Sequence, residues 1–232
     1  LREGDEVLIS LMEHHSDIVP WLALKKARGI VVKFIRVQGD GTLDMDDFRK
    51  KLTPKTRLVG IVHASNVLGT INPVKEICAM AHENGSLTLV DAAQSVPHLP
   101  VDVRDIDCDF LIASGHKMMA PSGIGFLYAK REHLERMEPF NYGGDMIMTV
   151  TTEEATWNEL PWKYEAGTPN ISGGIGLGAA VDYLTGIGME AIRRHECELT
   201  QYAYERLREI PWVTIYGPPP EQRVSVISFN VQ

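Results

Sequence analysis

A lysine follows directly on a short apolar segment near the middle of the chain. The string Ser114-Gly115-His116-Lys117 comes immediately after residues 110–113, which have the composition of a buried strand. Loss of hydrating water lowers the pKa of a lysine ammonium group, and a free lysine amine can attack a carbonyl carbon to form a Schiff base. A lysine that extends from a strand end into solvent would show the same pattern. Lys117 is therefore a candidate nucleophile, with a solvated surface lysine as the alternative.

A carboxylate and an amide follow a second apolar segment. Residues 87–91 end in Asp91, and Gln94 comes three residues later. In open α/β sheets, ligands bind outside the carboxyl ends of the strands. Strand ends that offer a carboxylate, an amide and a lysine fit pyridoxal phosphate, whose ring nitrogen requires a carboxylate partner and whose aldehyde requires a lysine. The alternative for Asp91 is a cap at the start of a helix, a position that aspartate favours.

The segments that must position these residues alternate between strand and helix patterns. This order predicts crossover connections and a mainly parallel sheet, and several strands are apolar throughout, as strands covered on both faces are. The predicted strands are residues 7–10, 31–37, 58–63, 87–91, 110–114 and 125–129. The sequence therefore predicts an α/β fold of three layers, in which helices cover both faces of the sheet.

The composition excludes several other classes. The chain has 232 residues, of which 44% are hydrophobic and 23% charged, so it can bury a core and is neither disordered nor fibrous. Its formal net charge of −8 and its scattered Lys and Arg argue against nucleic acid as the main partner. No apolar run approaches the roughly 20 residues that span a bilayer, and we expect a cytoplasmic protein without membrane contact. The three cysteines have no paired spacing, which predicts neither a disulfide framework nor a zinc site.

Helix ends and turns predict how the chain is divided. Asp44 and Asp47 resemble a capping pair for a helix over residues 45–52, and Asn72 is a candidate cap for a helix that begins at Pro73. An amphipathic pattern predicts a long helix over residues 189–209, followed by two strands at 213–216 and 224–229. Residues 142–169 read as loops.

A hairpin that follows the long helix needs further sheet or a covering helix to be stable. We therefore expect a large ligand-binding domain over residues 1–188 that is incomplete at its N-terminus. Residues 189–232 should form the connecting helix and the first strands of a small α/β domain that is cut short.

Several motifs occur in order along the whole chain. They are Met12-Glu13-His14-His15, Ile18-Val19-Pro20-Trp21, Ser65-Asn66-Val67-Leu68-Gly69-Thr70, Asp91-Ala92-Ala93-Gln94, Asp107-Cys108-Asp109-Phe110, Ser114-Gly115-His116-Lys117 and Glu165-Ala166-Gly167-Thr168-Pro169-Asn170. In identity, order and spacing they resemble the group II cysteine desulfurase and selenocysteine lyase family. That family belongs to the class V aminotransferase group and has the type I fold of pyridoxal-phosphate enzymes.

The resemblance implies a role for each matching position. Lys117 is similar to the lysine that binds the cofactor aldehyde and later moves the substrate α-proton. Asp91 is similar to the partner of the pyridinium nitrogen, and His14 to the imidazole that stacks on the ring and relays protons. Gln94 and Asn66 resemble residues that hydrogen-bond the phenolic oxygen of the cofactor or the carboxylate side of the substrate. His14 as a surface residue and Asn66 as a turn residue are the alternatives.

The remaining matches concern the cofactor phosphate. Ser114 and His116 resemble phosphate ligands of the same subunit. Thr168 resembles a hydroxyl that reaches the phosphate bound by the neighbouring subunit, although a role in shaping the turn before Pro169 is the alternative. The resemblance therefore implies a homodimer with shared active sites.

The implied reaction converts L-cysteine or L-selenocysteine to L-alanine. In the family, a cysteine on a mobile C-terminal loop takes the sulfur as a persulfide, which serves iron–sulfur cluster assembly or selenium metabolism through an acceptor protein. Cys78, Cys108 and Cys197 are poor candidates for this thiol, because they lie in predicted helices or before a buried strand. We therefore expect the chain to be the central part of a longer enzyme.

Three alternatives remain open. The first is another class V activity, such as an aminotransferase, an epimerase or a different β-lyase. The second is a truncated, non-catalytic chain, although the joint retention of the lysine, aspartate, glutamine and histidine argues against decay. The third is a metal hydrolase, which is weaker because adjacent histidines lack the i, i+4 spacing that places two ligands on one helix face. The residues considered for that metal are His14, His15, His63 and Asp91, and we expect no metal.

Overall fold

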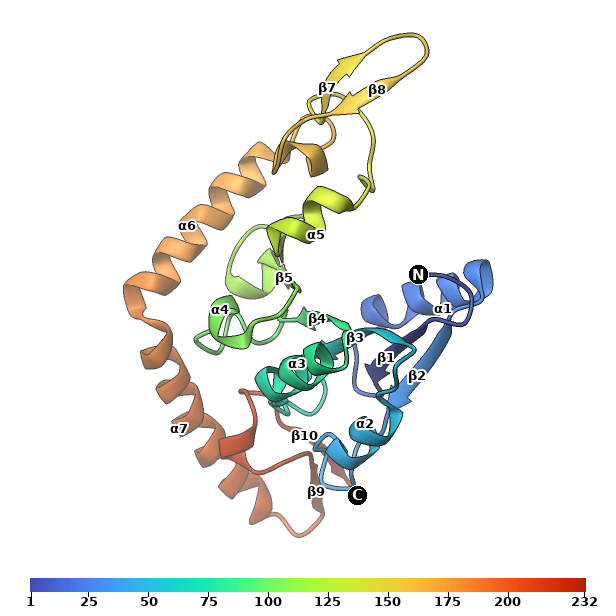
Figure 1. Cartoon of the computed structure of the whole chain (residues 1–232). Helices are drawn as coiled ribbons and strands as arrows, with labels where there is room; N and C mark the ends of the chain where they lie inside the picture. Colours follow the sequence, from blue (N-terminus) through green and yellow to red (C-terminus); the bar gives the residue numbers. More distant parts are fainter.

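The computed structural model describes all residues from Leu1 to Gln232 and centres on a six-stranded sheet (Figure 1). The strands are β1 (Glu6–Ser10), β2 (Val31–Ile35), β3 (Thr56–Val62), β4 (Leu87–Asp91), β5 (Phe110–Ser114) and β6 (Gly125–Ala129). Their order is β2-β1-β3-β4-β5-β6, and every neighbouring pair is parallel except the antiparallel pair β5–β6. The predicted α/β fold with a mainly parallel sheet is confirmed.

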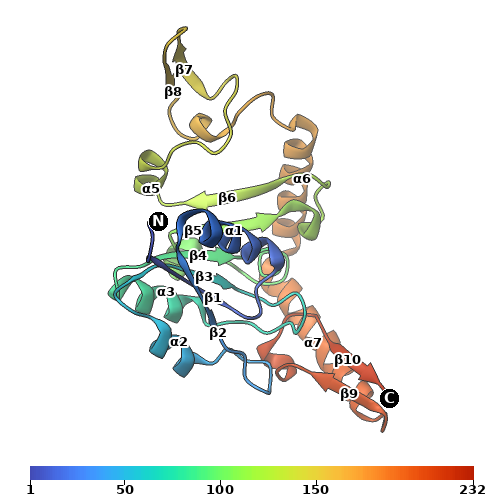
Figure 2. The same ribbon diagram turned by 90° about the vertical axis from the view of Figure 1, so that its right-hand side faces the viewer.

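Helices cover both faces of the sheet (Figure 2). Helix α1 (Val19–Arg28) packs on one face, where Trp21 lies against the buried cluster that includes Val7 and Ile9. Helices α2 (Met45–Lys51), α3 (Val74–Glu83) and α4 (Val103–Ile106) cover the main core, to which Leu8 belongs. Because successive side chains of a strand point to opposite faces, β1 contributes to both clusters.

Two long helices follow the sheet. Helices α6 (Ile171–Ile187) and α7 (Met189–Arg208) meet at an angle of 74° and run along one side of the molecule (Figure 1). Helix α7 occupies the predicted helical segment, and its end lies one residue before the predicted one. Neither helix by itself is long and apolar enough to cross a membrane; only the bent pair together meets the requirement of length and composition.

Two helix starts were predicted from capping residues, and they have different outcomes. Asp44 accepts a hydrogen bond from the Asp47 N–H at 2.9 Å and caps α2 as predicted. The predicted start of α3 is wrong, because α3 begins at Val74 and Asn72 makes no capping bond. Asn72 Nδ2 instead donates to the carbonyl oxygen of Val62 at 2.7 Å, and Oδ1, the atom that would cap the helix, is buried without a hydrogen-bond partner.

The chain beyond residue 136 contains two hairpins. Strands β7 (Ile147–Val150) and β8 (Ala155–Trp157) form one that projects from the molecule (Figure 1), so the prediction of loops over residues 142–169 is wrong there. Strands β9 (Val213–Tyr216) and β10 (Ser228–Val231) form the other. The second of these strands begins four residues later than predicted, because the Val224 N–H is bonded to the Gly69 carbonyl instead of to β9.

A buried arginine organises the segment between β9 and β10. Arg223 has no solvent exposure, and its guanidinium donates to the carbonyl oxygens of Tyr216, Pro218 and Val226. The guanidinium also lies over the Tyr204 ring of α7, 5.4 Å from the centroid. Carbonyl groups and an aromatic face therefore take the place of a carboxylate partner.

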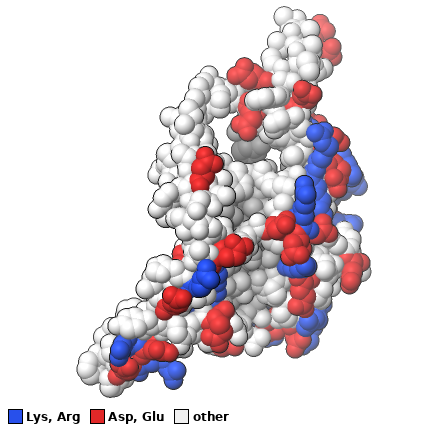
Figure 3. Space-filling model, turned by 90° about the vertical axis from the view of Figure 1, so that its left-hand side faces the viewer, with Lys and Arg blue, Asp and Glu red and all other residues white.

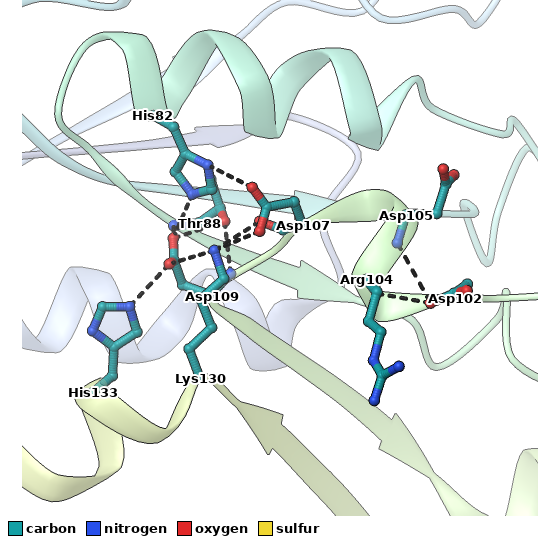
Figure 4. A network of polar contacts seen from close by, with 9 residues as sticks. All are labelled: His82, Thr88, Asp102, Arg104, Asp105, Asp107, Asp109, Lys130 and His133. Carbon is teal, nitrogen blue, oxygen red and sulfur yellow. Dashed lines mark hydrogen bonds and ion pairs between the residues drawn. The ribbon is translucent and has the colours of Figure 1, made fainter.

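A second polar network joins three elements around Asp109, the residue directly before β5 (Figure 4). Its carboxylate accepts hydrogen bonds from His82 of α3 at 2.8 Å and from His133 of α5 (Arg131–Arg136) at 2.9 Å. The Thr88 N–H of β4 donates to it at 2.8 Å, and Lys130 Nζ lies 3.4 Å away. Asp109 is 3% exposed and thereby ties helices to the end of the sheet opposite Lys117.

Few charged side chains lie along α6. On the face shown in Figure 3, acidic and basic side chains lie intermixed and leave a largely uncharged area along α6. Helix α6 carries one charged residue, Asp182. Exposed large apolar side chains on this helix include Ile171, Ile175 and Tyr183.

Candidate active site

A cavity of about 380 Å³ lies at the carboxyl ends of β4 and β5 and beside the loop after β1. Its lining residues are His14, Ser16, Asp91, Ala93, Ile112, Ala113, Ser114, His116 and Lys117. The parallel sheet brings these segments together because parallel strands end on the same edge. Five of the eight predicted site residues therefore line one cavity.

Lys117 lies in a short 3-10 helix, η2 (Gly115–Met118), which connects β5 to β6. The Gly115 N–H donates to the Ile124 carbonyl at 2.9 Å, and a Cβ on Gly115 would lie 2.8 Å from that carbonyl oxygen. The turn is therefore closed tightly by a residue without a side chain. Lys117 is half-buried, and its ammonium makes neither an ion pair nor a hydrogen bond within the chain.

Asp91 ends β4 and is 4% exposed. Its Oδ1 accepts a hydrogen bond from the Ala93 N–H at 2.9 Å, two residues ahead, so it shapes a turn and does not cap a helix. No donor of the chain binds Oδ2, and no cation pairs with the carboxylate. A buried carboxylate without a cation is costly, so the arrangement favours a ligand that brings its own donor.

Lys117 and Asp91 face the same cavity without pairing with each other. The space between an unpaired amine and an unpaired buried carboxylate suits a ligand with an electrophilic carbon at one end and a protonated nitrogen at the other. A substituted pyridine aldehyde has this chemistry. The residues present thus fit the group that the sequence predicts.

His14 lies at the mouth of the cavity and is exposed. Its Nδ1 accepts a hydrogen bond from the Ser16 N–H at 3.2 Å, and Ser16 Oγ lies 2.8 Å from the same nitrogen. Because a backbone N–H can only donate, Nδ1 is unprotonated and Nε2 carries the proton of the neutral ring. The sequence suggests Ser16 only as a cap for a helix over residues 18–28, and it does not cap α1. Its only signal as a site residue is a hydroxyl two residues after a histidine in a turn.

Three predicted residues do not line the cavity. Gln94 is half-buried in the turn after Asp91, and Asn66 is half-buried in the loop after β3. Thr168 is exposed in the segment before α6, directly after Gly167, which has a φ of 79°. The roles assigned to these three residues stay predictions.

The cysteines are removed from the cavity. Burial raises the pKa of the Cys78 thiol to about 12 and that of the Cys108 thiol to about 11. Both thiols therefore stay protonated at neutral pH. Cys197 is half-buried in α7. No three His, Cys, Asp or Glu side chains are placed to hold a metal ion.

A larger and more open depression of about 920 Å³ lies between the start of α3 and α4. The lysine on its rim, Lys75, is paired with Asp105 at 2.5 Å, so no free amine faces it. His63 also lines it, and burial lowers the pKa of this histidine to about 4. The smaller cavity, with its unpaired lysine and aspartate, is the better candidate for a catalytic site.

Comparisons with known proteins agree with this geometry. The family model of class-V aminotransferases matches residues 1–232. A probable cysteine desulfurase of Halalkalibacterium halodurans is 52% identical over 232 residues, which are all of this chain and 57% of that protein. The apo structure of a cysteine desulfurase from Thermococcus onnurineus superimposes with a TM-score of 0.96 at 40% identity and covers all of this chain and 58% of that one.

A more distant solved structure shows a bound cofactor. It is a variant of C-DES with glycine covalently linked to the PLP cofactor, and it matches with a TM-score of 0.88 at 28% identity over all of this chain and 62% of that one. The chain belongs to the class-V aminotransferase family. Within that family it is similar to the cysteine desulfurases, and it spans somewhat more than half the length of the relatives it matches.

Proposed function

We propose that the cavity binds pyridoxal phosphate, with Lys117 bonded to the aldehyde carbon and Asp91 to the ring nitrogen. One observation carries the proposal: an amine and a buried carboxylate face the same cavity, and neither forms an ion pair within the chain. Membership of the class-V aminotransferase family supports the same cofactor.

When bound, the cofactor withdraws electrons from the Cα atom of an amino acid that is joined to it. Asp91 Oδ2 would accept a hydrogen bond from the ring nitrogen and so favour its protonated form. The Lys117 amine would accept the substrate α-proton and return it. The Nε2–H group of His14 is available as a donor at the mouth of the cavity. Ser114 and His116, which line the same cavity, would bind the phosphate.

We further propose that the protein acts as a cysteine desulfurase or selenocysteine lyase that forms L-alanine. Similarity to several cysteine desulfurases over the whole chain supports this reaction. The sulfur would be accepted by a thiol other than Cys78 or Cys108, because both are buried and protonated. Gln94 and Asn66 would act on the cofactor oxygen or the substrate carboxylate side.

The same proposal includes a homodimer in the cytoplasm and a protein that accepts the sulfur. The exposed position of Thr168 fits a contact with the phosphate site of a second subunit. The exposed apolar side chains of α6 support an interface on that side. We keep the proposed division into residues 1–188 and 189–232, which falls at Gly188 with its φ of 90° between α6 and α7.

The test is to add pyridoxal phosphate to the purified chain, record the visible absorption, reduce with borohydride and map the labelled peptide. We expect the label on Lys117, no label in Lys117→Ala, and full labelling in Lys26→Ala. Lys26 is a matched control because it is an exposed lysine of α1 without a polar partner. Labelling that survives in Lys117→Ala would contradict the assignment. If no lysine is labelled, repeating the measurement with a chain extended at both ends separates an incomplete site from a wrong assignment.

A further inference from the structure

Two further carboxyl groups are buried on the side of the sheet that carries Asp91. Glu13, directly before His14, is 6% exposed, and Asp17 is 3% exposed. Neither forms an ion pair with a lysine, arginine or histidine of the chain. Ionising two buried carboxyl groups at once costs much free energy when no cation is near. We therefore expect at least one of the two groups to be protonated.

In each of the two carboxyl groups, one oxygen accepts hydrogen bonds from the chain. Glu13 Oε1 accepts from Ser10 Oγ at 2.5 Å and from the Val62 N–H at 3.0 Å. Asp17 Oδ1 accepts from the Trp21 indole N–H at 2.9 Å. The other two oxygens, Glu13 Oε2 and Asp17 Oδ2, are buried and receive no other donor.

Because neither oxygen has a donor, a proton held by one of the two carboxyl groups relieves the cost of burying two charges. Burial and the neighbouring charge of Asp17 raise the pKa of Glu13 well above its usual range. Burial raises the pKa of Asp17 to about 6, against the hydrogen bond from the Trp21 indole. The directions of the two pKa shifts favour a proton on Glu13 and the negative charge on Asp17.

The surrounding backbone leaves room for this arrangement. A Cβ on Gly60, in the middle of β3, would lie 3.1 Å from Asp17 Oδ2 and 3.0 Å from Cγ2 of Ile9. Asp91 lies opposite Val62 in the parallel register of β3 and β4, and the Val62 N–H is bonded to Glu13 Oε1. The charge of the pair therefore acts on Asp91 over a short distance.

We propose that Glu13 and Asp17 are positioning residues that share one proton and keep a single negative charge behind Asp91, which strengthens its hold on a protonated ring nitrogen. This inference rests on the proposed function, because it takes Asp91 as the partner of the ring nitrogen. A negative charge near the ring favours its protonated form, whereas a third ionised carboxyl group would destabilise the fold.

The shared proton can be measured without the cofactor. Infrared spectra of the chain should show the carbonyl stretch of a protonated carboxylic acid at neutral pH. We expect this band to be absent in Glu13→Gln and unchanged in Glu83→Gln, an exposed glutamate at the end of α3. A band that persists in Glu13→Gln, or no band in the unaltered chain, would overturn the assignment of the proton.

The link to Asp91 is read from the pH titration of the visible absorption of the cofactor-bound chain. Glu13→Gln should leave both the midpoint of this pH titration and the melting temperature unchanged. The amide of the new glutamine offers the same hydrogen-bond acceptor and donor as a neutral carboxylic acid. Asp17→Asn removes the negative charge and should lower the midpoint by about one pH unit, a tenfold loss in proton affinity. Equal shifts in the two variants, or none in Asp17→Asn, would contradict the proposal.

Labelling of Lys117 and the shift of the titration midpoint are independent measurements. If the unaltered chain, extended where needed, takes no label on Lys117, the proposed function is wrong and the link to Asp91 is wrong with it. If Lys117 is labelled but the midpoint does not respond to Asp17→Asn, the proposed function stands and the positioning role does not.

Discussion

A Cβ atom on Gly125 would lie 2.5 Å from the carbonyl oxygen of Ala113. The two residues belong to β6 and β5, and Gly125 lies opposite Ser114 in the antiparallel register. Because contact at this distance is repulsive, β6 can approach the end of β5 only with glycine at this position. The turn that carries Lys117 begins directly after this contact.

Replacing Gly125 by alanine should therefore disturb both strands. We expect Gly125→Ala to lower the free energy of unfolding by about 1–3 kcal/mol, as overpacking does, and to reduce labelling of Lys117 by pyridoxal phosphate. Gly178→Ala is the control, because a Cβ at Gly178 of α6 would meet nothing within 4 Å and should stabilise the helix by about 0.5–1 kcal/mol. Denaturant unfolding of both variants measures the difference, and equal stabilities would contradict the interpretation.

Removing the charge of Asp109 should weaken the packing of α3 and α5 on the sheet. The carboxylate accepts bonds from His82, His133 and Thr88, and an amide cannot accept all of them. We expect Asp109→Asn to cost about 1.5–3 kcal/mol in the free energy of unfolding, a range typical of bonds to a charged group. Asp182→Asn, at an exposed position of α6, should have no measurable effect.

Asp109 should also make the free energy of unfolding decrease in acid. Burial alone would raise the pKa of Asp109, but the hydrogen bonds from His82, His133 and Thr88 lower it to about 2, below the ordinary value of 3.8. A lowered folded-state pKa contributes stability that is present above pH 3.8 and is lost as the pH falls toward 2. Unfolding curves between these pH values should show a weaker dependence on pH for Asp109→Asn than for the unaltered chain.

The tautomer of His14 depends on Ser16. In Ser16→Ala the Oγ contact to Nδ1 is lost, although the backbone N–H bond remains. A hydrogen bond of this kind is worth about 1 kcal/mol, so the population with the proton on Nε2 should fall and the other tautomer should become detectable. Nitrogen NMR of the imidazole measures the two forms. An unchanged ratio would show that the backbone bond alone fixes the ring, and Ser122→Ala serves as an exposed control.

Arg223 should not be replaceable by lysine. An ammonium group cannot donate along the several directions in which the guanidinium reaches Tyr216, Pro218 and Val226. We expect Arg223→Lys to accelerate hydrogen exchange in residues 216–228 by more than tenfold, which corresponds to a local loss of about 1.4 kcal/mol or more. Exchange in the sheet should not change. The exposed Arg28→Lys, at the end of α1, is the control.

Sequence patterns predict the central strands best. Strands β4, β5 and β6 have the predicted bounds because their apolar segments are flanked by clear turns. Strands β7 and β8 were missed because only Ile147 and Trp157 at one end are partly buried, so the hairpin lacks an alternating pattern. Asn72 shows the limit of capping rules, since the same amide can instead bond to a strand carbonyl.

The candidate site was predictable where a residue ends a strand. Lys117 and Asp91 were found because each follows an apolar run at the edge where ligands bind. Glu13 and Asp17 were not, because charged residues are rarely buried and no pattern in the sequence indicates a shared proton. The one indication in the sequence is the four-residue spacing from Asp17 to Trp21, which on a helical turn allows a hydrogen bond between the two side chains.

The strand order has a consequence for how the chain folds. The cavity needs the ends of β1, β4 and β5, and β3 stands between β1 and β4 in the sheet. The binding site cannot exist in a partly assembled sheet, because these contacts are distant in sequence and form late in parallel topologies. A ligand that binds only the completed sheet stabilises the native state by mass action. The cofactor should therefore protect the chain against global unfolding and leave the rate of collapse unchanged.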